Sequence, residues 1–118
     1  MKTPGPKPAP PESRRKFERF PIDLRVTAHV FREGKTVSVW GRSTELGVDG
    51  IGVTLTGALE TDEVVTLELT LPLAPKPLKI RALVRFHNGL RHGLEFLAIT
   101  PDQRNLVKRV CEMLAAGQ

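Results

Sequence analysis

The feature that most constrains this chain is a period-two alternation of apolar and polar side chains, repeated in short runs from residue 24 to residue 97. Such alternation is typical of strands that bury one face and expose the other. The runs cover residues 24–30, 37–40, 51–55, 65–71, 78–86 and 90–97. Because each run has one apolar face, we expect the sheet to curl over that face into a small six-stranded antiparallel β-barrel.

The last segment has a helical pattern instead. Thr100 is placed as an N-cap, Pro101 occupies the first helical position, and Gln103 completes a capping box. Apolar side chains then recur at helical spacing until Gly117. The predicted fold is therefore mainly β, with a C-terminal α-helix that covers one opening of the barrel.

The length of 118 residues is that of a single small domain. Five prolines within residues 1–12 predict a disordered, proline-rich tail, so we place the folded domain at residues 13–116. The single cysteine excludes an internal disulfide, and the sequence has no apolar stretch of signal-peptide or membrane-span length. We expect a cytoplasmic protein without a membrane span.

Enzyme motifs are absent from the sequence. Its three histidines and three serines form no nucleophile elbow and no zinc-protease motif. His87 and His92 flank a predicted hairpin turn, where a structural role is favoured over metal binding. We therefore predict no catalytic residue, no metal site and no enzymatic activity.

Glycines cluster between residues 41 and 52, and this spacing predicts a shaped loop between two strands. A nucleotide fingerprint is excluded because no helix follows whose N-terminus would hold the phosphate. Glycine permits a positive φ or a close backbone approach at such a place.

Charge is concentrated in an arm formed by residues 13–20, just before the first predicted strand. Residues 1–20 contain six basic and two acidic side chains, so they carry +4 of the net charge of +5. A solvated charge run is one interpretation. The other is an anion site, because guanidinium groups bind phosphate oxygens and guanine edges in a bidentate manner and stack on flat rings.

The arm resembles the first motif of the PilZ family, bacterial domains that bind the second messenger cyclic di-GMP. Arg15 and Arg19 match the R-x-x-x-R pattern and Arg14 extends it, while the stretch from Gly93 to Phe96 is similar to the end of the family's last strand. The resemblance covers residues 13–115 and implies a barrel followed by a helix.

The second motif of the family, D/N-x-S-x-x-G, is only partly matched. Gly50 is retained, but Glu45 stands in place of Asp or Asn, and Gly47 stands in place of Ser. Loss of one hydroxyl hydrogen bond costs about 0.5–1.5 kcal/mol, or about 3- to 10-fold in affinity. The departures therefore predict weakened binding.

The resemblance implies a ligand, cyclic di-GMP, and no other cofactor. It assigns the ligand site to Arg14, Arg15, Arg19, Glu45, Gly47 and Gly50. Ordering of the arm over the ligand would then change the surface presented to an effector protein, which the sequence does not identify.

Two alternatives remain open. One is a degenerate adapter that acts through protein contacts without binding the nucleotide. The other is a small basic barrel that binds RNA or single-stranded DNA, although the chain has only five Phe, one Trp and no Tyr for stacking. We expect no DNA partner.

Overall fold

A computed structural model describes residues 17–117. Its seven strands and one helix are β1 (Phe20–Pro21), β2 (Arg25–Arg32), β3 (Lys35–Gly47), β4 (Gly50–Leu55), β5 (Val64–Leu69), β6 (Leu78–Asn88), β7 (Arg91–Ala98) and α1 (Pro101–Ala116). The predicted tail at residues 1–12, and with it the boundary of the folded domain, lies outside the described residues.

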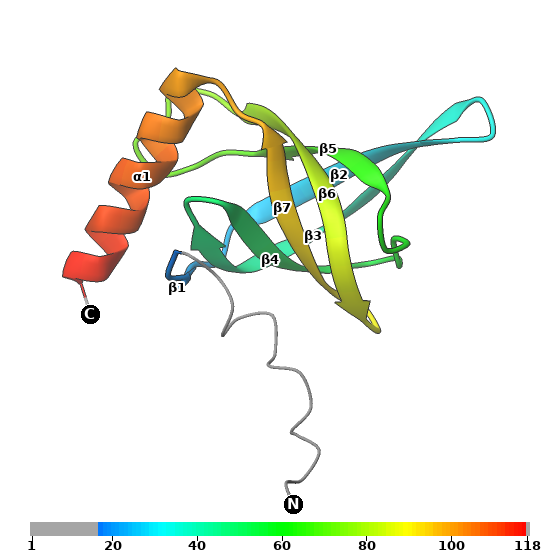
Figure 1. Ribbon diagram of the computed structural model, residues 1–118, viewed down its shortest axis with the longest axis horizontal. Helices are drawn as coiled ribbons and strands as arrows, with labels where there is room; N and C mark the ends of the chain where they lie inside the picture. Colours follow the sequence, from blue (N-terminus) through cyan, green and yellow to red (C-terminus); the bar gives the residue numbers. More distant parts are fainter. Residues whose placement is uncertain (1–16, 118) are drawn as a thin grey trace, which may run out of the picture.

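Six strands form a closed antiparallel barrel in the order β3-β2-β5-β6-β7-β4, and a pairing between β3 and β4 closes it. This confirms the predicted fold class (Figure 1). Closure depends on β3, which is long enough to pair with β2 over its first part and with β4 over its second part. A register shift between Ser43 and Glu45 lies in the second part. The short β1 pairs with the end of β3 and is an extra strand that the sequence pattern did not predict.

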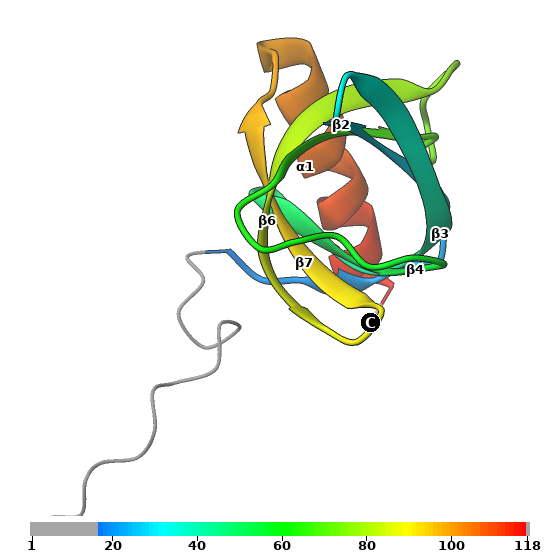
Figure 2. The ribbon, with the colours of Figure 1, turned by 90° about the vertical axis from the view of Figure 1, so that its right-hand side faces the viewer.

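The inward side chains are the apolar members of the predicted alternation. Along β2, for instance, Val26, Ala28 and Val30 are buried, whereas the residues between them are exposed or half-buried. The helix adds Leu106 and Val110 to the same core. Figure 2 looks along the barrel and shows α1 lying across its far end, which confirms the expected covering of one opening.

The cap of α1 forms as predicted. The Thr100 side chain accepts a hydrogen bond from the backbone N–H of Gln103, and the Gln103 side chain accepts one from the backbone N–H of Thr100. The Gln103 amide also donates to the carbonyl oxygen of Lys79 at 3.1 Å, which links the start of the helix to β6.

The prediction of a glycine-rich loop at residues 41–50 is wrong. Residues up to Gly47 continue β3, and β4 starts at Gly50, so only a two-residue turn separates the strands. Glycine usually weakens a strand interior because it has no side chain to pack. Here neighbouring groups lie so close to the backbone that a Cβ would collide with them, as described for the site below.

The two histidines flank the β6–β7 turn as predicted, but His92 is a core residue. Its Nδ1 donates to the carbonyl oxygen of Leu90 at 2.7 Å, and its Nε2 accepts from the backbone N–H of Leu59 at 3.0 Å. The His87 ring stacks on it with centroids 5.6 Å apart. Burial, with the charge of His87 adding to it, lowers the pKa of His92 below 6.5.

The lowered pKa of His92 predicts that the fold loses stability in acid. Because the pKa of His92 is lowered in the folded state, the unfolded chain binds the proton more readily. The contribution of His92 to the free energy of unfolding is therefore complete above pH 6.5 and is lost as the pH falls below that value. Urea unfolding should show the free energy of unfolding decreasing by up to about 1.4 kcal/mol per pH unit below that value. The variant His87→Asn should keep most of this slope. A free energy that is constant from neutral pH down to about pH 5 would contradict the assignment.

Candidate functional site

The candidate site lies on the outer face of the barrel, where the arm reaches β3. Phe20 and Pro21 of β1 pair with Leu46 and Glu45, which places the preceding Arg19 over the β3–β4 turn. The Arg19 side chain is only 9% exposed. Its Nη1 lies 3.6 Å from Glu45 Oε2, and its Nε lies 3.5 Å from Asp49 Oδ1. The site therefore holds one guanidinium group between two partly exposed carboxylates.

Glycine is required at positions 47 and 50 because Arg19 and neighbouring backbone groups lie directly on these residues. A Cβ on Gly47 would be 2.5 Å from the Arg19 Cδ and 2.9 Å from the carbonyl oxygen of Glu18. A Cβ on Gly50 would collide with the carbonyl oxygen of Leu94 and would lie 3.0 Å from Arg19 Nη2. Thus Gly47 does more than omit a hydroxyl group, since it provides the space that the Arg19 side chain fills.

The floor of the site continues across β4 and β7. Gly52 pairs with Glu45 on one side and with Gly93 on the other. A Cβ on Gly52 would be 3.0 Å from the Glu45 Cγ, and a Cβ on Gly93 would collide with the Phe86 ring. The Glu45 side chain and the Phe86 ring therefore lie directly on the backbone at Gly52 and Gly93, and both glycines are buried beneath them.

Ser43 holds the segment between β1 and β2 in place. Its buried hydroxyl donates to the carbonyl oxygen of Ile22 at 2.6 Å and accepts from the backbone N–H of Leu24 at 2.8 Å. The backbone N–H of Ser43 donates to the carbonyl oxygen of Leu24 at 2.7 Å. These bonds hold the segment that joins β1 to β2, and so they fix where Arg19 enters the site.

Replacing Ser43 by alanine should lower the free energy of unfolding by about 1–3 kcal/mol, because the Leu24 N–H loses its hydrogen-bond partner in a partly buried place. Urea titration measures this loss. Ser38→Ala, which removes a hydroxyl group that hydrogen-bonds the His29 ring on an exposed part of β3, is the matched control and should lower the free energy of unfolding by only a few tenths of that amount. Equal losses in the two variants would contradict the positioning role of Ser43.

The helix α1 packs against β3 beneath the candidate site. Cys111 on α1 places its Sγ 3.9 Å from the carbonyl oxygen of Leu46, the β3 residue that pairs with β1. Burial raises the pKa of the Cys111 thiol, and the charge of Arg19 opposes this rise. The core beneath the site is thus continuous with the packing of α1 on β1 and β3.

Four of the six predicted site residues are described, and they lie together. Arg19, Glu45, Gly47 and Gly50 meet at the β3–β4 turn. Arg14 and Arg15 lie outside the described residues. Sequence reasoning missed Asp49, Gly52 and Phe86 as site residues. The signal for Asp49 was its place between two glycines of the motif. The signal for Gly52 and Gly93 was their alternation with apolar residues, which marks them as outward positions of predicted strands.

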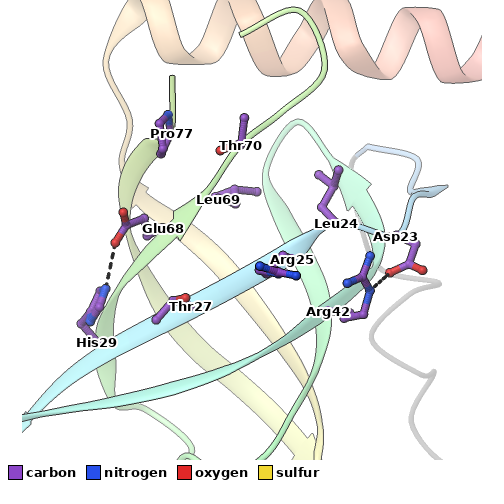
Figure 3. A pocket seen from close by; sticks show the side chains of 10 residues that line it. All are labelled: Asp23, Leu24, Arg25, Thr27, His29, Arg42, Glu68, Leu69, Thr70 and Pro77. Atoms are coloured by element: carbon purple, nitrogen blue, oxygen red, sulfur yellow. Dashed lines mark hydrogen bonds and ion pairs between the residues drawn. The ribbon is translucent and has the colours of Figure 1, made fainter. Parts of the chain in front are cut away.

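A separate groove of about 630 Å³ lies on the outer face of β2, β3 and β5 (Figure 3). Two pairs of its side chains contact each other: Arg42 Nε donates to Asp23 Oδ1 at 2.6 Å, and His29 Nε2 lies 3.0 Å from Glu68 Oε1. The lining residues are Asp23, Leu24, Arg25, Thr27, His29, Arg42, Glu68, Leu69, Thr70 and Pro77. This groove contains none of the predicted site residues.

Within residues 17–117, no group of three or more His, Cys, Asp and Glu side chains is placed to hold a metal ion. The one helix in this part of the chain is neither long enough nor apolar enough to cross a membrane.

Comparison with known proteins finds one sequence family. The profile of the PilZ domain matches residues 13–113. A search of curated proteins returns no significant match.

Solved structures with the same fold include two PilZ domains. The PilZ domain of YcgR from Escherichia coli, determined with c-di-GMP, aligns with a TM-score of 0.70 at 14% identity, over 88% of this chain and 93% of that one. The PilZ domain of CeSA from a cellulose-synthesizing bacterium aligns with a TM-score of 0.60 at 19% identity, over 79% and 93% of the two chains.

A third similar structure is a longer protein. The inhibitor of motility MotI/DgrA of Bacillus subtilis aligns with a TM-score of 0.72 at 21% identity. The alignment covers 89% of this chain and 52% of that protein. At these identities, the likeness to solved structures concerns the fold.

Proposed function

This chain belongs to the PilZ domain family, and we propose that it is a receptor module for cyclic di-GMP that signals through its N-terminal arm. The ligand would lie on the outer barrel face at the β3–β4 turn. The module is proposed to act by binding rather than by catalysis.

The observation that carries this proposal is the position of Arg19. Its guanidinium group lies across Gly47 and Gly50, beside Glu45, so the second arginine of the first motif lies on the second motif. A guanidinium group at this position suits a compact ligand with two phosphates and two purines, because it binds phosphate oxygens and stacks on rings.

The floor of the site suits a guanine base. Glycine at position 93 lets the Phe86 ring lie flat on β7, and this half-buried ring offers a surface for a base. A base can stack against such a surface, and stacking on an aromatic side chain contributes about 1–3 kcal/mol per base. Glu45 supplies a carboxylate that accepts hydrogen bonds from the N–H groups of guanine.

Binding is proposed to reorder the arm. Arg19 is 9% exposed and lies between Glu45 and Asp49, so it must turn toward an incoming phosphate and give up part of its contact with these carboxylates. Arg14 and Arg15 are proposed to add phosphate contacts. The changed arm would then be the surface that an effector protein recognises.

This competition predicts that Asp49→Asn tightens binding of cyclic di-GMP. The substitution removes a negative charge that attracts Arg19 and repels the ligand phosphates, so we expect the dissociation constant to fall about 3- to 10-fold. Calorimetric titration at low and at physiological salt measures the change. Asp102→Asn, an equivalent change in the first turn of α1, should leave the affinity unaltered. Weaker binding by Asp49→Asn would show that the carboxylate helps the ligand.

The proposal itself is tested by calorimetric titration of the full chain with cyclic di-GMP at physiological salt. Saturable binding at micromolar or lower concentration is expected, with no binding of GTP. A short single-stranded oligonucleotide serves as the third titrant. Binding of that oligonucleotide with a steep salt dependence would favour a nucleic-acid-binding barrel instead.

A second candidate function is an adapter that does not bind the nucleotide. The observation that favours it is the ion pairing of Arg19 with Glu45 and Asp49, which gives the guanidinium charge two counter-charges without a ligand. Absence of heat with cyclic di-GMP, for both the natural chain and Asp49→Asn, would support the adapter and overturn the receptor.

A further inference from the structure

The hairpin of β2 and β3 extends beyond the barrel as a two-stranded ribbon, residues 30–40, which projects at the right of Figure 1. Pairing of β2 with β5 covers only residues 26–29, and pairing of β3 with β4 begins at Gly41. Within residues 17–117, each strand of the ribbon therefore has a partner strand on one side only.

The β3 edge of the ribbon presents backbone groups that are ready to pair. The carbonyl oxygen of Trp40 accepts from the backbone N–H of Thr56 at 2.8 Å, so the backbone groups of even-numbered residues point away from β2. Thr36 and Ser38 follow the same alternation. Between residues 17 and 117, no backbone hydrogen bond reaches these two residues from that side.

The two edges of the ribbon differ in how they are protected. On the β2 edge, Arg32 donates to Glu63 through Nε at 2.8 Å and through Nη2 at 2.7 Å, and this hydrogen bonding lowers the pKa of Glu63. Residues 36–40 of the β3 edge contain no charge and no proline, the usual devices that prevent edge pairing. The β3 edge is therefore the one open to another strand.

Apolar side chains along the ribbon also remain exposed. Phe31 is 71% exposed, Trp40 is 58% exposed and Val37 is 37% exposed. Val37 lies opposite Val30, which is buried, on the inner face of the hairpin. A strand added at this edge would cover Val37 and complete that apolar row.

The edge is complementary to itself. If two copies pair antiparallel about Val37, Thr36 of each copy lies opposite Ser38 of the other, and their backbone groups form hydrogen bonds in both directions. The inner face then carries Val30 and Val37 of one copy next to Val37 and Val30 of the second copy. No charged residue lies opposite a like charge. We propose that this chain forms a dimer by antiparallel pairing of the β3 edges at residues 36–38.

The test measures the mass of the full chain in solution by sedimentation equilibrium, without nucleotide, from micromolar to sub-millimolar concentration. The outcome is thus independent of the proposed function. A concentration-dependent dimer is expected for the natural chain, and V37K should be monomeric throughout because two like charges would face each other across the two-fold axis. The control V64K, at a β5 valine that is 40% exposed, should dimerise as the natural chain does.

Mixing two variants tests the register. V37K and V37E should each be monomeric, and an equimolar mixture should form a heterodimer because opposite charges then face each other. Thermal unfolding of each variant checks that it is folded. A natural chain that stays monomeric, a V37K variant that dimerises, or folded variants that fail to associate when mixed would overturn the proposal.

Discussion

Replacing Arg19 by alanine should weaken binding of cyclic di-GMP about 10- to 150-fold, which corresponds to about 1.5–3 kcal/mol for a charged hydrogen bond. The expected loss is large because Arg19 is the described cation that lies on the floor of the site, across Gly47 and Gly50. Truncation also leaves Glu45 and Asp49 without this counter-charge, and their remaining negative charge repels a dianionic ligand. Calorimetric titration measures the change in the dissociation constant.

The matched control is Arg104→Ala, which removes the same charge from an exposed position on α1. It should alter the affinity by less than about twofold, since salt screens a solvent-exposed charge that does not contact the site. Circular dichroism establishes that both variants are folded. If Arg19→Ala binds as tightly as the natural chain, the guanidinium group does not contact the ligand and the proposed site is wrong.

Gly50→Ala should lower the free energy of unfolding by about 1–3 kcal/mol or more. The added methyl group would collide with the carbonyl oxygen of Leu94, which is backbone of the neighbouring strand β7 and cannot rotate away. Relief therefore requires β4 to move away from β7, where the barrel is closed by strand pairing. Urea unfolding followed by circular dichroism measures the loss.

Gly57→Ala is the control for the loss of glycine itself. A Cβ at that position would lie 3.6 Å from the Val39 Cγ1, an ordinary van der Waals contact. This variant should retain the stability of the natural chain or gain a few tenths of a kcal/mol, because alanine restricts the unfolded chain. Equal destabilisation of the two variants would contradict the steric account of Gly50.

The elements of the fold were predictable because their signals are local. Alternation such as that of Val26, Ala28 and Val30 depends only on which side chains face the core, and the capping box at Thr100 depends on residues three apart. The segment at residues 41–50 was not predictable in this way. Its glycines indicated a loop, and only the close approach of Arg19 and of Leu94 explains why a strand contains them.

The candidate site was likewise predictable from the sequence only in part. Spacing within the chain was enough to select Arg19 and Gly50, since the matched family motifs are short and contiguous. Asp49 could not be assigned, because its carboxylate matters only through its distance of 3.5 Å from a side chain thirty positions earlier. Phe86 likewise joins the site through Gly93, on the adjacent strand.

The sequence by itself determined the barrel, the helix and the family, because these follow from periodicity, capping and motif spacing. The tertiary structure alone decided that Arg19 lies on the β3–β4 turn, that two carboxylates contact it there, and that one edge of the ribbon has no partner strand among the described residues. Those properties depend on distances between segments far apart in the chain. Such distances exist only after strand pairing has closed the barrel.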